Sequence, residues 1–131
     1  MEQPAKAHHI LVAEDDPVMA KLLEFTLMRE NYTVTICRMG DTVVEKAKQH
    51  KPDLLLVDYI LPRMTGDQIA AAFKQDPELS DVPIIVVTGQ GRESVRNEML
   101  NIGVQEVFTK PFSPIALMGV IKKYLEQTAE T

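Results

Sequence analysis

Residues 54–66 read LLLVDYILPRMTG, in which an apolar run at 54–57 is followed by the carboxylate of Asp58 and then by a loop with a proline and a turn glycine. A continuous apolar run of this length is typical of a strand buried on both faces, as in a parallel sheet. A carboxylate at the end of such a strand needs a polar or charged partner. Asp58 is therefore the first candidate functional residue.

Four further apolar runs of strand length recur at residues 9–13, 33–37, 83–87 and 106–109. Between the runs lie helix signals, the clearest being Asp16-Pro17 and Ser113-Pro114, each a capping residue followed by a proline at the first helical position. Apolar residues at helical spacing predict the inward faces: Met19, Leu22, Leu23 and Leu27; Val44 and Ala47; Ile69 and Phe73; Val95, Met99 and Ile102; and Leu117, Ile121, Tyr124 and Leu125. The alternation predicts a doubly wound α/β domain, with a mostly parallel five-stranded sheet and helices on both faces.

Composition limits the classes of function. With 131 residues, 45% of them hydrophobic, the chain is expected to form one domain at 9–127, with a flexible lead at 1–8 and a frayed tail at 128–131. A net charge of −5 gives no basic footprint for nucleic acid. No run approaches the roughly 18 apolar residues of a membrane helix. The single cysteine, Cys37, has apolar neighbours and favours a reducing, cytoplasmic location.

Polar side chains follow four of the predicted strands: Glu14 and Asp15, Asp58, Thr88, and Lys110. Ligands of doubly wound sheets lie outside the carboxyl ends of the strands, so these side chains should meet at one edge. Clustered carboxylates repel one another unless a cation neutralises them, and oxygen ligands without His or Cys suit Mg²⁺. The Lys110 ammonium and the Thr88 hydroxyl suit phosphate oxygens. The pattern predicts a small phosphoryl-transfer site.

These residues also carry a resemblance to a known family. The segments ILVAEDDP at 10–17, LVDYILPRMTG at 56–66, VVTG at 86–89 and TKPF at 109–112 resemble the motifs of the receiver domain of two-component response regulators, including chemotaxis regulators. The resemblance covers nearly all of residues 8–127. By this match Glu14 and Asp15 correspond to the family's acidic pair, Asp58 to its phosphoacceptor, Thr88 to its switch hydroxyl and Lys110 to its lysine.

The resemblance implies a flavodoxin-like sheet of order 2-1-3-4-5. It implies that a histidine kinase or a histidine phosphotransfer protein donates a phosphoryl group to Asp58, assisted by Thr88 and Lys110. The expected metal is Mg²⁺, held by Glu14, Asp15, Asp58 and the backbone carbonyl of Ile60. The expected output is protein binding through the face built from the fourth helix, the fifth strand and the fifth helix. Such a chain is a phosphoacceptor switch rather than an enzyme.

Some polar residues have a simpler structural interpretation. Asp16 precedes Pro17 and is expected to cap a helix rather than bind a ligand. The histidines His8, His9 and His50 are expected at the surface or at strand ends, since no second ligand lies at metal spacing.

Two positions depart from the family pattern. The place that commonly holds an inward-turning Tyr or Phe holds Val107, and Phe108 should point to the opposite face because side chains alternate along a strand. Two residues after Asp58 lies Ile60, which cannot orient water with its side chain. Gln90 is then the remaining candidate for that task.

Three alternatives use a similar layout. An aspartate-dependent phosphatase needs a second carboxylate two residues after the nucleophile, where this chain has Ile60. A flavin carrier needs a phosphate-cradling loop after the first strand, where the acidic pair would repel phosphate. A non-phosphorylated pseudo-receiver used as a scaffold is disfavoured by the intact acidic, hydroxyl and lysine set, and stays as the alternative function.

Overall fold

The computed structural model describes residues 7–89 and 93–129. Within them, five strands alternate with five α-helices and one short 3₁₀ helix, η1. The strands are β1 His9–Ala13, β2 Thr33–Cys37, β3 Leu54–Asp58, β4 Ile84–Thr88 and β5 Glu106–Thr109. The helical segments are α1 Pro17–Arg29, η1 Gly40–Thr42, α2 Val43–His50, α3 Gly66–Gln75, α4 Glu93–Ile102 and α5 Pro114–Ala129. All strands pair in parallel in the order β2-β1-β3-β4-β5, so the predicted fold class and sheet order are confirmed.

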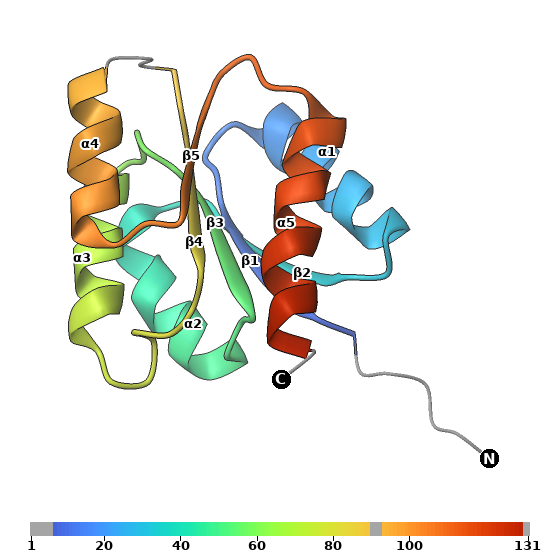
Figure 1. The fold of residues 1–131 in the computed structure, drawn as a ribbon, viewed down its shortest axis with the longest axis horizontal. Coiled ribbons are helices and arrows are strands. Elements are labelled where there is room, and N and C mark those ends of the chain that lie inside the picture. The colour runs from blue at the N-terminus through green and yellow to red at the C-terminus, as the bar shows by residue number, and fades with distance from the viewer. Residues whose placement is uncertain (1–6, 90–92, 130–131) are drawn as a thin grey trace.

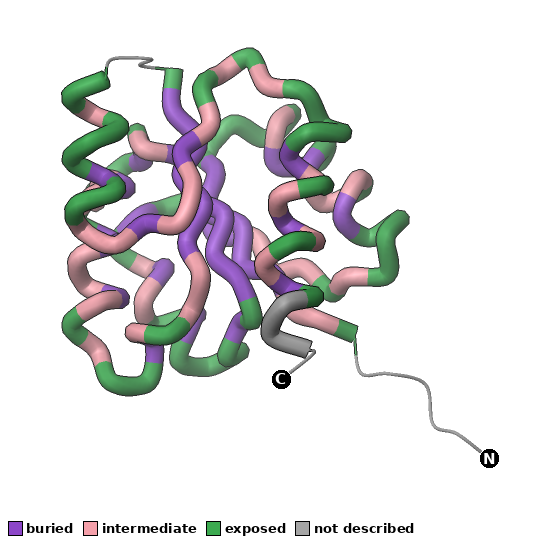
Figure 2. The backbone as a smooth tube through the Cα atoms, viewed as in Figure 1, coloured by how far each residue is buried: buried purple, intermediate pink, exposed green. Residues whose placement is uncertain are grey.

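Two hydrophobic layers enclose the sheet. Helices α1 and α5 cover one face, and α2, α3 and α4 cover the other (Figure 1). The three central strands lie between these layers and are buried almost throughout, as the continuous apolar runs predicted (Figure 2). No helix among the described residues is long and apolar enough to cross a membrane.

Local signals set the beginnings of the helices. The Asp16 carboxylate accepts a hydrogen bond from the backbone N–H of Val18 at 3.0 Å, so Asp16 is the helix cap that the sequence predicted. The Ser113 hydroxyl accepts one from the backbone N–H of Ala116 at 3.2 Å. Each bond satisfies a donor that the first turn of a helix leaves unpaired.

The sequence was wrong about one inward-facing residue of α1. The buried positions are Ala20, Leu23 and Leu27, whereas Leu22 is 46% exposed. Successive residues turn by about 100° around a helix, which carries Leu22 off the stripe that meets the sheet. On the other side of the sheet, the predicted inward residues Ile69 and Phe73 are fully buried.

The ends of β3 and β4 also differ slightly from the predicted runs. Strand β4 begins at Ile84 rather than Pro83, although the carbonyl of Pro83 still accepts a hydrogen bond from Leu55. Asp58 and Thr88 are the last residues of their strands rather than the first residues of loops. Their backbones are therefore fixed by the sheet.

Candidate phosphoryl-transfer site

Three ionisable side chains from three strand ends meet at the carboxyl edge of the sheet. The Lys110 ammonium lies 3.0 Å from a carboxylate oxygen of Asp58 and 3.3 Å from one of Glu14. Both carboxylates are buried, with Glu14 3% and Asp58 9% exposed. One cation thus bridges two buried anions that lie far apart in the sequence.

Burial shapes the electrostatics of this cluster. Loss of solvent is the main cause that raises the pKa of Glu14, and the Asp58 charge adds to it, against the lowering effects of the Asp16 backbone N–H and of Lys110. Burial opposes the charge on Lys110, but its bonds to Asp58 and Glu14 outweigh this and raise its pKa. The cluster holds Lys110 protonated and leaves Glu14 incompletely compensated.

Asp15 completes an acidic group with Glu14 and Asp58. Each of the three offers a carboxylate oxygen, and these oxygens lie within 4.8 Å of one another. Asp15 is exposed, so this ligand position faces solvent. A set of carboxylate oxygens with one side open to water fits a hard divalent cation such as Mg²⁺.

Sequence reasoning missed the residue that holds the backbone of Asp15. Arg38 follows β2 and donates two hydrogen bonds to the Asp15 carbonyl, at 3.2 Å from Nε and 3.1 Å from Nη2. Two donors of one guanidinium group thus reach the same carbonyl oxygen, which ties this backbone position to the end of β2. The sequence offers one signal, since Arg38 directly follows the predicted strand at 33–37, but this position gains meaning only because β2 lies beside β1.

Thr88 and Lys110 are tied together by the backbone. Thr88 is 1% exposed and stands opposite Thr109 in the pairing of β4 with β5. The N–H of Lys110 donates to the carbonyl of Thr88 at 2.7 Å. A shift of the end of β4 would therefore also move the backbone that carries the Lys110 ammonium.

The loop after Asp58 contributes its backbone. The N–H of Ile60 donates to a carboxylate oxygen of Asp58 at 3.3 Å, while the Ile60 side chain is 58% exposed. Gly66 closes the loop, because its N–H bonds to the Tyr59 carbonyl at 2.7 Å and an added Cβ would lie 2.8 Å from the Tyr59 Cα. Gln90, the other predicted water-orienting residue, lies outside the described residues.

The departure at β5 has the geometry that alternation predicted. Val107 is buried in the layer that contains Met99 of α4, whereas Phe108 packs into the opposite layer and meets Phe112 edge-on at 6.5 Å. Arg96 of α4 donates to the Val107 carbonyl at 3.1 Å. The arginine thus joins α4 to β5 at the position that lacks the aromatic ring.

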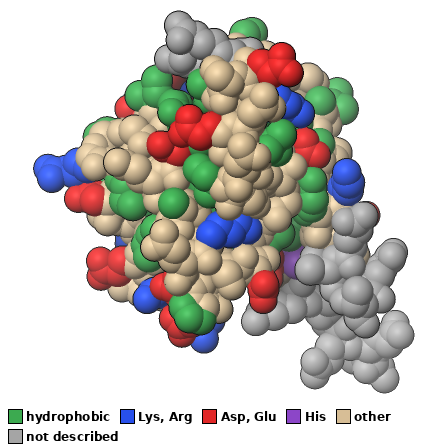
Figure 3. Space-filling view, turned by 60° about the vertical axis from the view of Figure 1, so that its left-hand side comes forward, with side chains coloured by type: hydrophobic (Ala, Val, Ile, Leu, Met, Phe, Trp, Pro, Cys, Tyr) green, Lys and Arg blue, Asp and Glu red, His purple; other side chains and the backbone are tan. Residues whose placement is uncertain are grey.

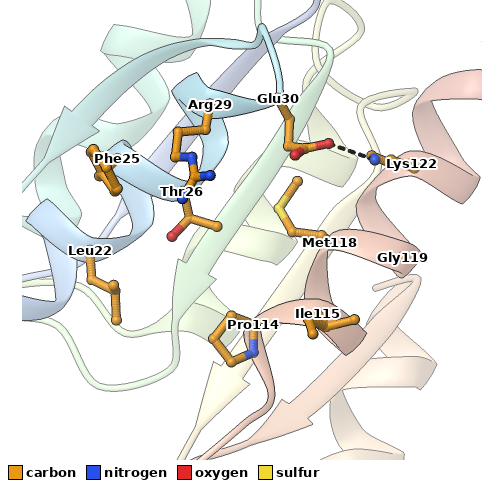
Figure 4. A pocket seen from close by; sticks show the side chains of 10 residues that line it. All are labelled: Leu22, Phe25, Thr26, Arg29, Glu30, Pro114, Ile115, Met118, Gly119 and Lys122. Atoms are coloured by element: carbon orange, nitrogen blue, oxygen red, sulfur yellow. Dashed lines mark ion pairs between the residues drawn. The ribbon is translucent and has the colours of Figure 1, made fainter.

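An apolar groove lies elsewhere, between α1 and α5. It has a volume of about 620 Å³, and its lining includes Leu22, Phe25 and Ile115 (Figure 4). The bridge from Lys122 to Glu30, at 2.6 Å, crosses its rim. None of the acidic-cluster residues lines it, so the groove is separate from the site.

Comparison with known proteins identifies the family. The model of the response regulator receiver domain matches residues 10–122. The phosphate regulon transcriptional regulatory protein PhoB of Rhizobium meliloti is 34% identical over 90% of this chain, which spans only 52% of that relative.

Two solved structures are similar over most of their length. The signal receiver domain of a histidine kinase from Syntrophus aciditrophicus has a TM-score of 0.88 at 28% identity, covering 95% of each chain. The receiver domain of sensor histidine kinase PA1611 from Pseudomonas aeruginosa, with a magnesium ion coordinated in its active site cleft, has a TM-score of 0.84 at 26% identity, covering 92% of this chain and 99% of that one. The chain belongs to the response regulator receiver domain family, whose members are phosphoacceptor switches of two-component signalling rather than classical enzymes.

Proposed function

We propose that this chain accepts a phosphoryl group on Asp58 and uses it to change which protein it binds. The observation that carries the proposal is the bridge of Lys110 between the buried carboxylates of Asp58 and Glu14. An Asp58 oxygen attacks the phosphorus of a phosphohistidine, a P–O bond forms, the P–N bond breaks, and the imidazole nitrogen leaves. The donor is a histidine kinase or a histidine phosphotransfer protein.

The metal of the proposal is Mg²⁺, as in the PA1611 receiver domain. Glu14, Asp15, Asp58 and the carbonyl of Ile60 would hold it, with water filling the remaining positions. The fit rests on the three carboxylate oxygens within 4.8 Å of one another and on the exposed position of Asp15. When bound, the ion supplies positive charge that offsets the negative charge of a phosphoryl group.

Lys110 and Thr88 receive the new oxygens. A phosphoryl group on Asp58 adds about one negative charge and several acceptor oxygens. The Lys110 ammonium already touches Asp58 and can donate to such an oxygen in a charge-assisted bond. The Thr88 hydroxyl would move toward the same group, and the backbone bond to Lys110 would carry that shift into β5.

The output is protein binding through α4, β5 and α5. Arg96 links α4 to β5 through the Val107 carbonyl, so a shift at the end of β5 would also displace α4. On the face in Figure 3, acidic, basic and hydrophobic side chains are interspersed, without a basic stripe that would hold nucleic acid. We place this function in the cytoplasm, in one unit at residues 9–127, acting without nucleic acid or membrane.

The direct test is labelling with acetyl phosphate and Mg²⁺, followed by intact-protein mass spectrometry. Wild type should gain one phosphoryl group and Asp58→Asn none. Asp16→Asn is the matched control, because it removes a neighbouring carboxylate while Asn still caps the helix. Full labelling of Asp58→Asn would show that another residue is the acceptor. Absence of labelling in wild type would favour a pseudo-receiver scaffold.

A further inference from the structure

The amino end of the sheet, opposite the acidic site, holds an unexpected group of titratable side chains. The rings of His9, at the start of β1, and His50, the last residue of α2, are stacked with centroids 5.8 Å apart. A carboxylate oxygen of Asp53 accepts the backbone N–H of His9 at 2.7 Å. Lys51 and His8 line the same hollow of about 730 Å³.

Hydrogen bonds fix the His9 ring. Its Nδ1 lies 2.7 Å from the Thr33 hydroxyl and its Nε2 2.9 Å from the Thr35 hydroxyl, both from β2. A neutral imidazole donates from one nitrogen and accepts at the other, and a hydroxyl can do either, so the neutral ring is fully satisfied. A charged ring would donate from both nitrogens, and the hydroxyl that donates to the neutral ring would have to turn.

Charge at this point acts on three elements at once. Besides the two threonines of β2, His9 meets α2 through His50 and the loop before β3 through Asp53, whose N–H donates to the His9 carbonyl at 2.7 Å. Positive charge on His50 suits the C-terminal end of α2. Two charged rings at stacking distance repel each other, and Asp53 is the one anion facing them among the residues that line the hollow.

We propose that His9 and His50 form a pH-sensitive clasp, so that acidification from about pH 7.5 to about pH 5.5 loosens the junction of β1, β2 and α2 while the phosphorylation site stays intact. The inference goes beyond the proposed phosphoacceptor function. The clasp would respond to pH in this way even if Asp58 were not the acceptor.

Electrostatics agree with this geometry. Burial is the main cause that lowers the pKa of His9, the His50 charge lowers it further, and Asp53 raises it. The unfolded chain therefore binds more protons than the folded chain at mildly acidic pH. Stability contributed by this residue is present above the usual histidine pKa of 6.5 and is lost as the pH falls.

Two variants with opposite effects test the clasp by NMR titration of the His9 imidazole. His50→Gln removes a neighbouring positive charge and should raise the pKa of His9. Asp53→Asn keeps an oxygen acceptor but removes the negative charge, and should lower that pKa. His8→Gln is the control. The His8 ring lies against Tyr32, with centroids 6.4 Å apart, so this variant should leave the pKa of His9 unchanged.

A second readout is the melting temperature at pH 7.5 and pH 5.5. Between pH 7.5 and pH 5.5 the melting temperature of wild type should fall further than that of His50→Gln. Added salt should reduce this difference between the two proteins, because His50 is exposed. Labelling by acetyl phosphate at pH 7.5 should be equal in both proteins. The clasp is overturned if the two variants shift the pKa of His9 in the same direction or not at all, if the acid loss is unchanged in His50→Gln, or if that variant loses labelling.

Discussion

The two ends of the sheet carry similar groups with the signs of charge exchanged. At the carboxyl end, two carboxylates, Glu14 and Asp58, share one cation, Lys110. At the amino end, two imidazoles, His9 and His50, lie beside one carboxylate. Carboxylates stay charged at neutral pH, whereas imidazoles can discharge there. The first end therefore keeps an excess of negative charge that a cation can offset, whereas the His9 ring at the second end becomes positive only as the pH falls.

The difference predicts opposite responses to pH. A raised pKa of Glu14 means that the folded chain binds more protons than the unfolded chain, so this residue costs stability as the pH rises above its usual value of 4.5. A lowered pKa of His9 costs stability as the pH falls. At one end of the sheet Glu14 thus costs stability as the pH rises, and at the other end His9 costs stability as the pH falls. The apolar strands lie between them.

The largest effect should come from removing the exposed carboxylate of the acidic end. Asp15→Ala should weaken Mg²⁺ binding by at least about 100-fold, the upper end of what outer-shell partners of metals cost. Phosphorylation at moderate Mg²⁺ should be lost with it, while the His9 titration stays as in wild type. Metal titration followed by labelling measures both, and labelling with the wild-type Mg²⁺ dependence would remove Asp15 from the site.

The next effect concerns the lifetime of the phosphoryl group. The exposed Ile60 side chain cannot hydrogen-bond a water in line with the phosphorus, and positioning supplies much of the catalysis in phosphoryl transfer. Ile60→Asn should speed dephosphorylation about tenfold, or ~1.4 kcal/mol of barrier. Gln90→Ala should slow it modestly.

Decay in Mg²⁺ buffer after removal of the donor measures this lifetime. Ile60→Val is the control, since it stays apolar and should decay as wild type does. Decay of wild type within seconds, or equal rates in the Asn and Val variants, would show that another group sets the lifetime.

A smaller effect should appear in stability. In metal-free buffer at pH 7, Glu14→Gln removes a buried charge and should raise the free energy of unfolding by on the order of 1 kcal/mol. The advantage should shrink as the pH falls from 7 to 4, below the usual pKa of 4.5, because protonation removes the charge of Glu14 in both states. Mg²⁺ should reverse the order, since at ten times its Kd it adds about 1.4 kcal/mol to a protein that binds it. Chemical denaturation at both pH values, with and without Mg²⁺, measures these free energies of unfolding. If Glu14→Gln is less stable than wild type in metal-free buffer at pH 7, the buried charge of Glu14 does not cost stability.

The sequence predicted features that depend on neighbouring residues. Continuous apolar runs located the central strands, and Pro17 and Pro114 located two helix starts, because burial on both faces and proline at the first turn leave local patterns. It also placed Glu14, Asp58 and Lys110 at one edge, because parallel strands align their carboxyl ends.

Features that depend on how elements pack were missed. The bond of Arg38 to the Asp15 carbonyl requires β2 to lie beside β1. The exposure of Leu22 depends on the rotation of α1, and the stack of His9 on His50 depends on where α2 ends. These details arise from geometry that periodicity and capping do not encode.

The smallest expected effect is the relay of the signal, and it separates the two ends most directly. Val107 is too small to fill the space that a moving Thr88 would leave, so the change should pass through the backbone bond from Lys110 to Thr88 and through Arg96 to α4. Phosphorylation should alter amide exchange in β5 and α4 by about threefold, or ~0.6 kcal/mol of local opening free energy. Residues 49–53 at the amino end should exchange as before. Hydrogen exchange with and without acetyl phosphate measures this, and Asp58→Asn with the same donor is the control. Changes confined to α1 and α2 would refute the route through β5 and α4. Equal changes at both ends of the sheet would also refute it, because the conformational change would then have passed along the apolar strands to the amino end.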